Sequence, residues 1–369
     1  MHEPPVLQQI DETHVLHQGR SLVYFGGSDY LRLSWHPQVR AAMARGVEAL
    51  GTNSAASRST TGNLPVYGEL ESQLQRFFGT SSATLVSAGY MAPLVAAQAL
   101  GPEHDAVLLD ERVHACLHDA ASLTGLPVRT FAHRDPAGLK RELNRANGQG
   151  RVLVMTDGLF SSTGDAAPLA EYLPMLARRG TLLVDDAHGV GVLGLRGRGT
   201  LEWAGVPYRR VVVTGTLSKA FGCYGGLVLG SRALRSAIFQ RSRLFVGNTP
   251  PPPPCAAAGL AALEVLRLEG KARRERMQGN MERLRAVLRE IDGEHHDEPG
   301  PMLAIRTERA STNERIRRLL LESGIYPSLI RYPNGPSPCF FRFAVSSEHT
   351  PSQISALAEV LRMGLRRRS

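Results

Sequence analysis

Lys219 lies in the stretch VVVTGTLSKAFGCYGG (residues 211–226), with an apolar run before it and small residues after it. The chain has only three lysines among its 43 Lys and Arg residues, and Lys140 and Lys271 lie in charged, helix-like stretches. A lysine amine, unlike a guanidinium, can lose its proton when it is desolvated and then attack a carbonyl carbon. The context indicates either a covalent role for Lys219 or a lysine that extends from a strand end into solvent.

Asp185 and His188 follow another apolar run, in TLLVDDAHGVGVLG (181–194). Open α/β sheets bind ligands at the carboxyl ends of their strands, which is where Asp185 is expected. A carboxylate there can hold the ring nitrogen of pyridoxal phosphate protonated, so that the ring withdraws electrons. The alternative is that Asp185 only caps a turn.

A set of small residues after a third apolar run is a candidate phosphate site. In LVSAGYMAP (85–93), Ala88, Gly89 and Tyr90 are placed at an expected strand-to-helix turn, where backbone N–H groups point outward. Thr216 and Ser218 can add hydroxyl groups beside Lys219. Many such turns contain a glycine, so this pattern alone is weak.

The segment GVGVLG (189–194) matches the G-x-G-x-x-G pattern of dinucleotide-binding proteins. That pattern requires a helix directly afterwards and an acidic residue about 20 positions on. The glycine-rich segment LRGRGTLEWAG follows instead. A nicotinamide cofactor is therefore not expected.

The elements that must position these residues are short apolar runs that alternate with helix-like stretches. This alternation predicts an α/β fold with a mostly parallel sheet covered by helices, and the unbroken apolar runs are typical of strands buried on both faces. Helices are expected near 36–50 and 66–78, the latter ended by Gly79. The expected strands lie at 83–86, 106–109, 127–131, 151–155, 181–184, 210–214 and 225–230.

The second part of the chain has a different pattern. The run TPPPPP (249–254) is predicted to be a polyproline connection rather than helix or central strand. Strands are expected near 301–306 and 339–345, and a closing helix is expected to begin with a capping box between Thr350 and Gln353.

The length of 369 residues predicts one large and one smaller domain. We expect residues 1–50 to be an arm that joins the small domain, 51–248 the cofactor-binding domain, and 249–369 a smaller α+β domain, with an interdomain helix over 255–280. A hydrophobic content of 43% and a charged content of 21% are typical of globular proteins.

The bulk properties exclude several classes of protein. No run of 18 apolar residues and no signal-like start is found, and the four cysteines are far apart, so a cytoplasmic protein without metal or disulfides is expected. The net charge of +9 permits binding of anionic ligands. The arginines of the chain are dispersed and are not interleaved with aromatic residues, so a nucleic-acid-binding protein is the weaker alternative.

The chain also resembles a known family over nearly its whole length: the α-oxoamine synthases, pyridoxal-phosphate enzymes of the aspartate aminotransferase fold (fold type I). The order and spacing of the matching motifs both agree. The motifs are GSDYLRLSWHP, SRSTTG, GYMAP, DERVHACLHDAA, TDGLFSSTGDAAPL, VDDAHGVGVLGLRGRG, TLSKAFG and FRFAVSSEHT.

The resemblance implies a role for each matching residue around the cofactor ring. Lys219 resembles the Schiff-base lysine, and Asp185 resembles the partner of the pyridine nitrogen. His188 and Ser161 resemble the residues that bond the phenolic oxygen. His114 resembles the histidine that stacks on the ring.

The resemblance also implies phosphate and substrate contacts. Ala88, Gly89, Tyr90 and Thr216 correspond to the phosphate site, and Thr249 corresponds to a phosphate contact donated by the second subunit of a homodimer. In the substrate site, Arg342 resembles the arginine that binds the amino-acid carboxylate, and a guanidinium suits that planar anion. Ser28, also in the substrate site, stands where the family usually has Asn.

The implied reaction is a decarboxylative condensation of an amino acid with an acyl thioester, either acyl-CoA or an acyl carrier. Within the family, 8-amino-7-oxononanoate synthase of biotin synthesis is the leading expectation. Glycine C-acetyltransferase and an aminotransferase of the same fold are the alternatives. Arg32, Tyr67 and Ala88 depart from the family pattern, and the segment 324–339 is expected to shape the acyl channel, so the substrates stay open.

Overall fold

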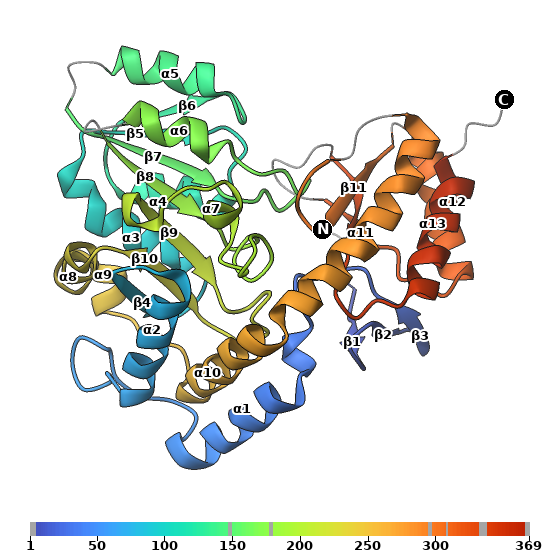
Figure 1. The fold of residues 1–369 in the computed structure, drawn as a ribbon, viewed down its shortest axis with the longest axis horizontal. Coiled ribbons are helices and arrows are strands. Elements are labelled where there is room, and N and C mark those ends of the chain that lie inside the picture. Colours follow the sequence, from blue (N-terminus) through green and yellow to red (C-terminus); the bar gives the residue numbers. More distant parts are fainter. Residues whose placement is uncertain are drawn as a thin grey trace.

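A seven-stranded sheet forms the centre of the larger part of the molecule (Figure 1). The computed structural model describes residues 5–146, 150–176, 180–293, 297–307, 309–331 and 338–365. The strand order is β4-β10-β9-β8-β7-β5-β6, and β10 is antiparallel to both of its neighbours whereas the other pairs are parallel. The strands are β4 (Ser82–Val86), β5 (Ala106–Asp110), β6 (Val128–Phe131), β7 (Val152–Asp157), β8 (Gly180–Asp185), β9 (Val211–Thr216) and β10 (Gly226–Gly230). The predicted mostly parallel sheet and its seven strands are confirmed.

Helices cover both faces of this sheet, because successive strand residues point to opposite sides. In β7, Val154 packs into one buried cluster with α2, α5, α6 and α10, whereas Leu153 and Met155 pack into another with α3, α4 and α8. The helices of this part are α2 (Pro65–Phe78), α3 (Met91–Leu100), α4 (Ala115–Leu123), α5 (Pro136–Arg145), α6 (Leu169–Leu176), α7 (Thr200–Trp203), α8 (Arg232–Arg241) and α9 (Arg243–Val246). Three short 3-10 helices are η1 (Leu33–Trp35), η2 (Gly101–Glu103) and η3 (Tyr208–Arg210).

The smaller part has its own three-stranded antiparallel sheet of order β11-β13-β12. Phe25 from the N-terminal segment packs into its core with Phe341 and Phe343. The strands and helices are β11 (Met302–Arg306), β12 (Leu329–Ile330), β13 (Phe340–Ala344), α11 (Gly270–Asp292), α12 (Ala310–Glu322) and α13 (Pro351–Leu365). A separate antiparallel sheet near the N-terminus contains β1 (Gln8–Gln9), β2 (His14–His17) and β3 (Arg20–Val23).

The predicted helix boundaries are largely confirmed. The helix predicted near 36–50 is α1 (Pro37–Leu50), and α2 ends at Gly79, which has the left-handed backbone φ of 69°. The capping box of α13 is present: Gln353 accepts from the backbone N–H of Thr350 at 2.9 Å, and the Thr350 hydroxyl accepts from the N–H of Gln353 at 3.3 Å.

Two expectations for the proline run and the helix after it are wrong. The last two prolines are helical, since α10 (Pro253–Leu268) begins at Pro253. The first turn of a helix needs no N–H donors, so proline is tolerated there. In place of one helix over 255–280, the structure has α10 and α11, separated at Glu269.

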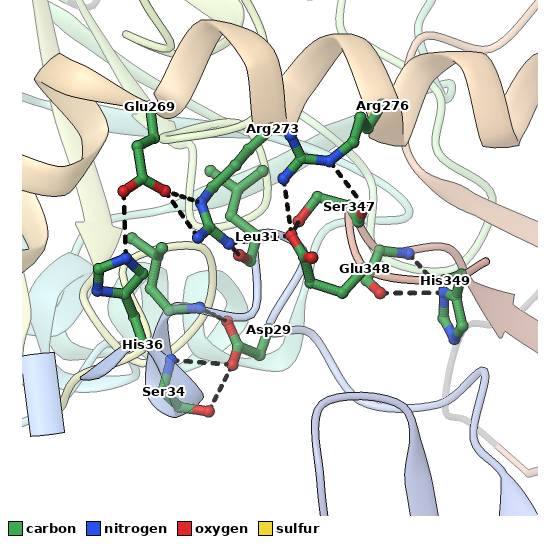
Figure 2. A network of polar contacts seen from close by, with 12 residues as sticks. Asp29, Leu31, Ser34, His36, Glu269, Arg273, Arg276, Ser347, Glu348 and His349 are labelled. Carbon is green, nitrogen blue, oxygen red and sulfur yellow. Dashed lines mark hydrogen bonds and ion pairs between the residues drawn. The ribbon is translucent and has the colours of Figure 1, made fainter. Parts of the chain in front are cut away.

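A polar network holds the start of α11 against the N-terminal segment and the segment after β13 (Figure 2). Arg273 donates to Glu269, to Glu348 and to the carbonyl of Leu31, at 2.8–3.0 Å. His36 lies 3.3 Å from the same Glu269 carboxylate. Arg273 therefore connects the start of α11, the N-terminal segment and the segment after β13 by hydrogen bonds.

Candidate active site

Lys219 lies on a tight turn between β9 and β10. The turn is closed by backbone hydrogen bonds from Gly222 to the Lys219 carbonyl and from Leu217 to the Gly225 carbonyl, both 2.8 Å. Gly222 has a φ of 62°, and a Cβ there would come within 2.1 Å of the Ser34 nitrogen. Only glycine fits, so the turn and the N-terminal segment hold the lysine in one place.

Lys219 faces a cavity of about 250 Å³ at the carboxyl edge of the large sheet, next to β13. Burial lowers the pKa of the Lys219 amine, although Asp185 and Asp157 oppose this effect. A lowered pKa makes the neutral, nucleophilic amine more accessible near pH 7. The cavity is lined by Ser28, His114, Ser161, Ser162, His188, Lys219, Ile330 and Arg342.

Asp185 and Asp157 end neighbouring parallel strands and are paired in the sheet register. Asp185 is buried, accepts from the Thr214 hydroxyl at 3.0 Å and lies 3.4 Å from the Cys116 sulfur. Burial and the charge of Asp185 raise the pKa of Asp157 well above its ordinary value. Burial and the neighbouring Asp185 therefore favour the protonated form of Asp157.

His114 begins α4 and is fixed from both sides. Its backbone N–H donates to Asp157 at 2.8 Å, and its Nδ1 accepts from the backbone N–H of Cys116 at 3.2 Å. Burial lowers the pKa of His114, with Asp185 raising it and Lys219 lowering it. At neutral pH the ring is therefore an uncharged plane on the cavity wall.

His188 is oriented by a chain of hydrogen bonds that begins at Arg342. The Arg342 Nη2 donates to the Tyr30 hydroxyl at 3.3 Å, and that hydroxyl lies 2.7 Å from the His188 Nδ1. Burial lowers the pKa of His188 well below its ordinary value. The tautomer of His188 that carries its proton on Nε2 would accept the Tyr30 proton at Nδ1 and keep the Nε2 N–H as a donor.

Arg342, on β13, reaches the cavity with a guanidinium that is held by neutral oxygens. Its Nε donates to the carbonyl of Ser161 at 2.8 Å, and its Nη1 donates to the carbonyl of Gly27 at 3.3 Å. Ser161 and Ser28 both line the cavity beside it. These contacts orient the arginine without neutralising it, so its charge stays available for an anion.

The candidate phosphate residues lie next to the Lys219 turn. A Cβ on Gly89 would be 2.7 Å from the Cβ and Oγ1 of Thr216, so only glycine allows this approach. The Thr216 hydroxyl donates to the Gly225 carbonyl at 3.0 Å and lies 2.7 Å from the Ser218 hydroxyl. Ala88 and Tyr90 directly precede α3, whose N-terminus favours an anion. The Tyr90 ring meets the His114 ring edge-on, with centroids 5.9 Å apart.

Thr249 does not line the Lys219 cavity. It lines a separate small cavity with Ser87, Asn248 and other residues, and the Asn248 amide donates to the Ser87 hydroxyl at 2.9 Å. The expected contact with a second subunit therefore stays a prediction.

Sequence reasoning missed three residues at this site. Asp157 ends β7 as Asp185 ends β8, and this equal placement at a sheet edge is the signal that could have found it. Tyr30 lies within the motif GSDYL, but nothing in its spacing points to His188. Cys116 had no signal, and burial raises the pKa of its thiol, which makes it unreactive.

Comparison with known proteins agrees with this arrangement. The family model for aminotransferase class I and II matches residues 20–361. A putative 8-amino-7-oxononanoate synthase from Desulforudis audaxviator is 38% identical over 96% of this chain and 92% of its own length. The 8-amino-7-oxononanoate synthase of Methylococcus capsulatus is 39% identical over the same shares of the two chains.

Solved structures give the same picture. Serine palmitoyltransferase from S. paucimobilis superimposes with a TM-score of 0.91 at 27% identity, covering 98% of this chain and 92% of that chain. The 8-amino-7-oxononanoate synthase of Francisella tularensis superimposes with a TM-score of 0.77 at 26% identity, covering 93% and 97%. The fold is thus that of the fold type I pyridoxal-phosphate transferases.

Within that class, the chain belongs to the α-oxoamine synthases, which are pyridoxal-phosphate-dependent acyltransferases. The residues present fit the cofactor. A desolvated lysine, a buried carboxylate, a neutral histidine plane and a glycine that admits Thr216 all occur around one sheet edge. Among the described residues no cluster of metal-ligating side chains is found, and no helix among them is long and apolar enough to cross a membrane.

Proposed function

We propose that the chain is an 8-amino-7-oxononanoate synthase, a C-acyltransferase that condenses an amino acid with an acyl thioester and releases carbon dioxide. The observation that carries this proposal is the lysine of lowered pKa beside Asp185, together with the relatives of 35–39% identity over most of the chain. The named product carries its amino group on the carbon next to a terminal methyl group. Alanine would supply those two carbons, and the acyl thioester of a dicarboxylic acid would supply the rest.

When bound, pyridoxal phosphate supplies an aldehyde for the substrate amine and a ring that withdraws electrons from the adjacent carbon. In our proposal Lys219 is the residue that holds the cofactor covalently. The Lys219 amine, when not bonded to the cofactor, would remove the proton from the substrate Cα as a general base. Its lowered pKa suits this role, since a base must be neutral at the working pH.

The other ring contacts follow from the positions of the cavity residues. Asp185 would keep the ring nitrogen protonated, because its carboxyl group is buried at the end of β8 and close enough to act on the charge of the Lys219 amine. His114 would cover one face of the ring as an uncharged plane. His188 would donate its Nε2 proton to the phenolic oxygen, with Ser161 beside it.

Phosphate and substrate contacts complete the proposal. Ala88, Gly89, Tyr90 and Thr216 would bind the phosphate at the start of α3, with Thr249 of a second subunit. Arg342 would bind the carboxylate of the amino acid, and Ser28 would lie beside it. The segment 324–339 was expected to shape the acyl channel. Its residues 332–337 lie outside the described residues.

The decisive experiment is a matrix of amino acids against acyl-CoA and acyl-carrier donors, scored for thiol release and carbon dioxide. Highest turnover with alanine and a dicarboxylic acyl thioester is expected. Highest turnover with glycine and acetyl-CoA would favour the acetyltransferase alternative. Conversion of the cofactor to its amine form by an amino acid alone would favour an aminotransferase.

We further propose a cytoplasmic homodimer whose active sites contain residues of both chains. The support is that Thr249 matches a phosphate contact of the family yet lies apart from the Lys219 cavity within one chain. Sedimentation of the active enzyme is expected to give twice the mass of one chain, and a fully active monomer would contradict it.

A further inference from the structure

A second and larger cavity, of about 620 Å³, lies between α2, α10, the start of α11 and the loop before α7. In Figure 1, α2 and α10 run side by side below the loop that leads into α7. This cavity shares no lining residue with the cavity at Lys219. It is also of the size that holds a small organic ligand.

Its wall is unusually positive. Gln73 and four apolar residues line it together with six cationic side chains, and no acidic residue is part of the lining. Three carboxylates lie nearby: Glu264 pairs with Arg267 at 3.1 Å, Glu275 with Lys271 at 3.7 Å, and Glu202 accepts backbone N–H groups of the loop. They leave an excess of positive charge at the wall. The cationic side chains are Arg76, Arg196, Arg198, Arg267, Lys271 and Arg274.

Arg274 is the buried member of this wall, with 5% of its surface exposed. Its Nη2 donates to the carbonyl of Leu195 at 2.8 Å, but its Nη1 has no hydrogen-bond partner among the described residues. A Cβ on Gly197 or Gly270 would come within 2.6 or 2.9 Å of this Nη1, so two glycines make room for the guanidinium. A buried positive charge with a single carbonyl partner is costly, and an anion in the cavity would offset that cost by its charge.

The neighbouring arginine gives the contrast. Arg273, one residue before, is also largely buried, and its guanidinium is satisfied by Glu269, Glu348 and the Leu31 carbonyl (Figure 2). Among the described residues, one of the two adjacent arginines thus has carboxylate partners and the other has a single carbonyl. The Nε of Arg198, on the facing loop, also has no partner among the described residues.

From this geometry we infer a second ligand site, at which a phosphorylated organic anion of nucleotide size binds in the cavity of Arg274. The cations provide charge-assisted hydrogen bonds to phosphate oxygens, for which arginine is well suited. The apolar side chains Phe77, Leu263 and Leu266 provide a surface for an aromatic base. The site is independent of the acyltransferase proposal, because none of its residues lines the cavity at Lys219.

The test is titration calorimetry with ADP and with inorganic pyrophosphate at fixed ionic strength. ADP is expected to bind more tightly than pyrophosphate, since only ADP has a base for the apolar wall. The double variant R76Q/K271Q is expected to weaken ADP binding about tenfold or more, because it removes two cations that can donate charge-assisted hydrogen bonds to the phosphate oxygens. Both side chains are exposed, so the fold should be retained.

The matched control is R129Q/K140Q, which removes the same charge from exposed positions outside the cavity. This control is expected to bind ADP within about twofold of the unmodified protein, because distant surface charges are screened by salt. An equal loss in the control, or no ADP binding by the unmodified protein, would overturn the inference. So would an unchanged affinity in R76Q/K271Q.

Discussion

The cavity of Lys219 and the cavity of Arg274 are built from neighbouring parts of the chain but differ in their charge. The loop after β8 contributes His188 to the first and Leu195 to the second, and Phe77 of the second meets Phe221 of the lysine turn at 6.2 Å between centroids. In the first cavity buried carboxyl groups stand close to the amine. In the second, all the charged residues of the described lining are cations.

The charged groups around Lys219 and around Arg274 suit different chemical roles. Near Lys219, burial lowers the pKa of the amine and so favours its neutral, nucleophilic form, while Asp185 opposes this effect. Near Arg274, burial also lowers the pKa of the guanidinium and Glu202 and Glu275 oppose this effect, but a guanidinium does not lose its proton. The first arrangement suits proton transfer, and the second suits binding of an anion.

The largest expected effect comes from removing the amine. Lys219→Ala is expected to lower kcat by at least about 10⁴-fold, because one residue supplies both the covalent bond and the general base. The folded protein should also lose the absorbance of the lysine-bound cofactor. Lys140→Ala, on an exposed face of α5, is the control and should change neither kcat nor the cofactor absorbance. If the Lys219 variant keeps that absorbance, the role of Lys219 is wrong.

The next effect separates the two carboxyl groups. Asp185→Asn is expected to lower kcat about 10²–10³-fold, since it removes the anion proposed to face the ring nitrogen. Asp157→Asn should cost about tenfold, because Asp157 contacts the backbone N–H of His114 and its raised pKa already favours the neutral form. Steady-state kinetics together with the cofactor spectrum would check both. Equal losses would show that the pair acts as one unit.

Much of the lysine site was predictable because its residues end strands or lie on turns that the sequence marks clearly. The apolar runs fixed the sheet, and Lys219, Asp185 and His188 follow such runs directly. Tyr30 could not be predicted from the runs, because its contact with His188 joins positions 158 residues apart.

The second cavity had no sequence signal at all. Its cations come from α2, α10, α11 and one loop, and dispersed arginines look like ordinary surface charge in the sequence. The helical start of α10 at Pro253 was missed for another reason: the rule that excludes proline from helix interiors does not apply to the first turn of a helix.

A smaller effect tests the loop that contributes to both cavities. Asp186 is buried and accepts from the backbone N–H and hydroxyl of Thr200, and burial raises its pKa to about 7. An unfolded aspartate titrates near pH 4, so between about pH 4 and 7 the folded chain binds more protons and its stability falls as pH rises. Asp186→Asn should remove this dependence, at most about 1.4 kcal/mol per pH unit.

Denaturant unfolding at several pH values would measure that slope. Glu322→Gln, on the exposed end of α12, is a suitable control because it also removes one carboxyl group. A slope that is the same in Asp186→Asn and in the unmodified protein would mean that Asp186 stays ionised in the fold.

The smallest effects distinguish the two adjacent arginines of α11. Arg273→Gln leaves Glu269 without its main partner and removes one of the two arginines that pair with Glu348, so it should lower the free energy of unfolding by about 1–3 kcal/mol. Arg274→Gln removes a buried charge whose single hydrogen-bond partner among the described residues is a carbonyl, so the cost should be below about 1 kcal/mol while ADP binding is weakened. Unfolding by urea and titration with ADP would be measured on both variants. If Arg274→Gln costs as much as Arg273→Gln and leaves ADP binding unchanged, Arg274 is a structural residue and the contrast between the two cavities fails.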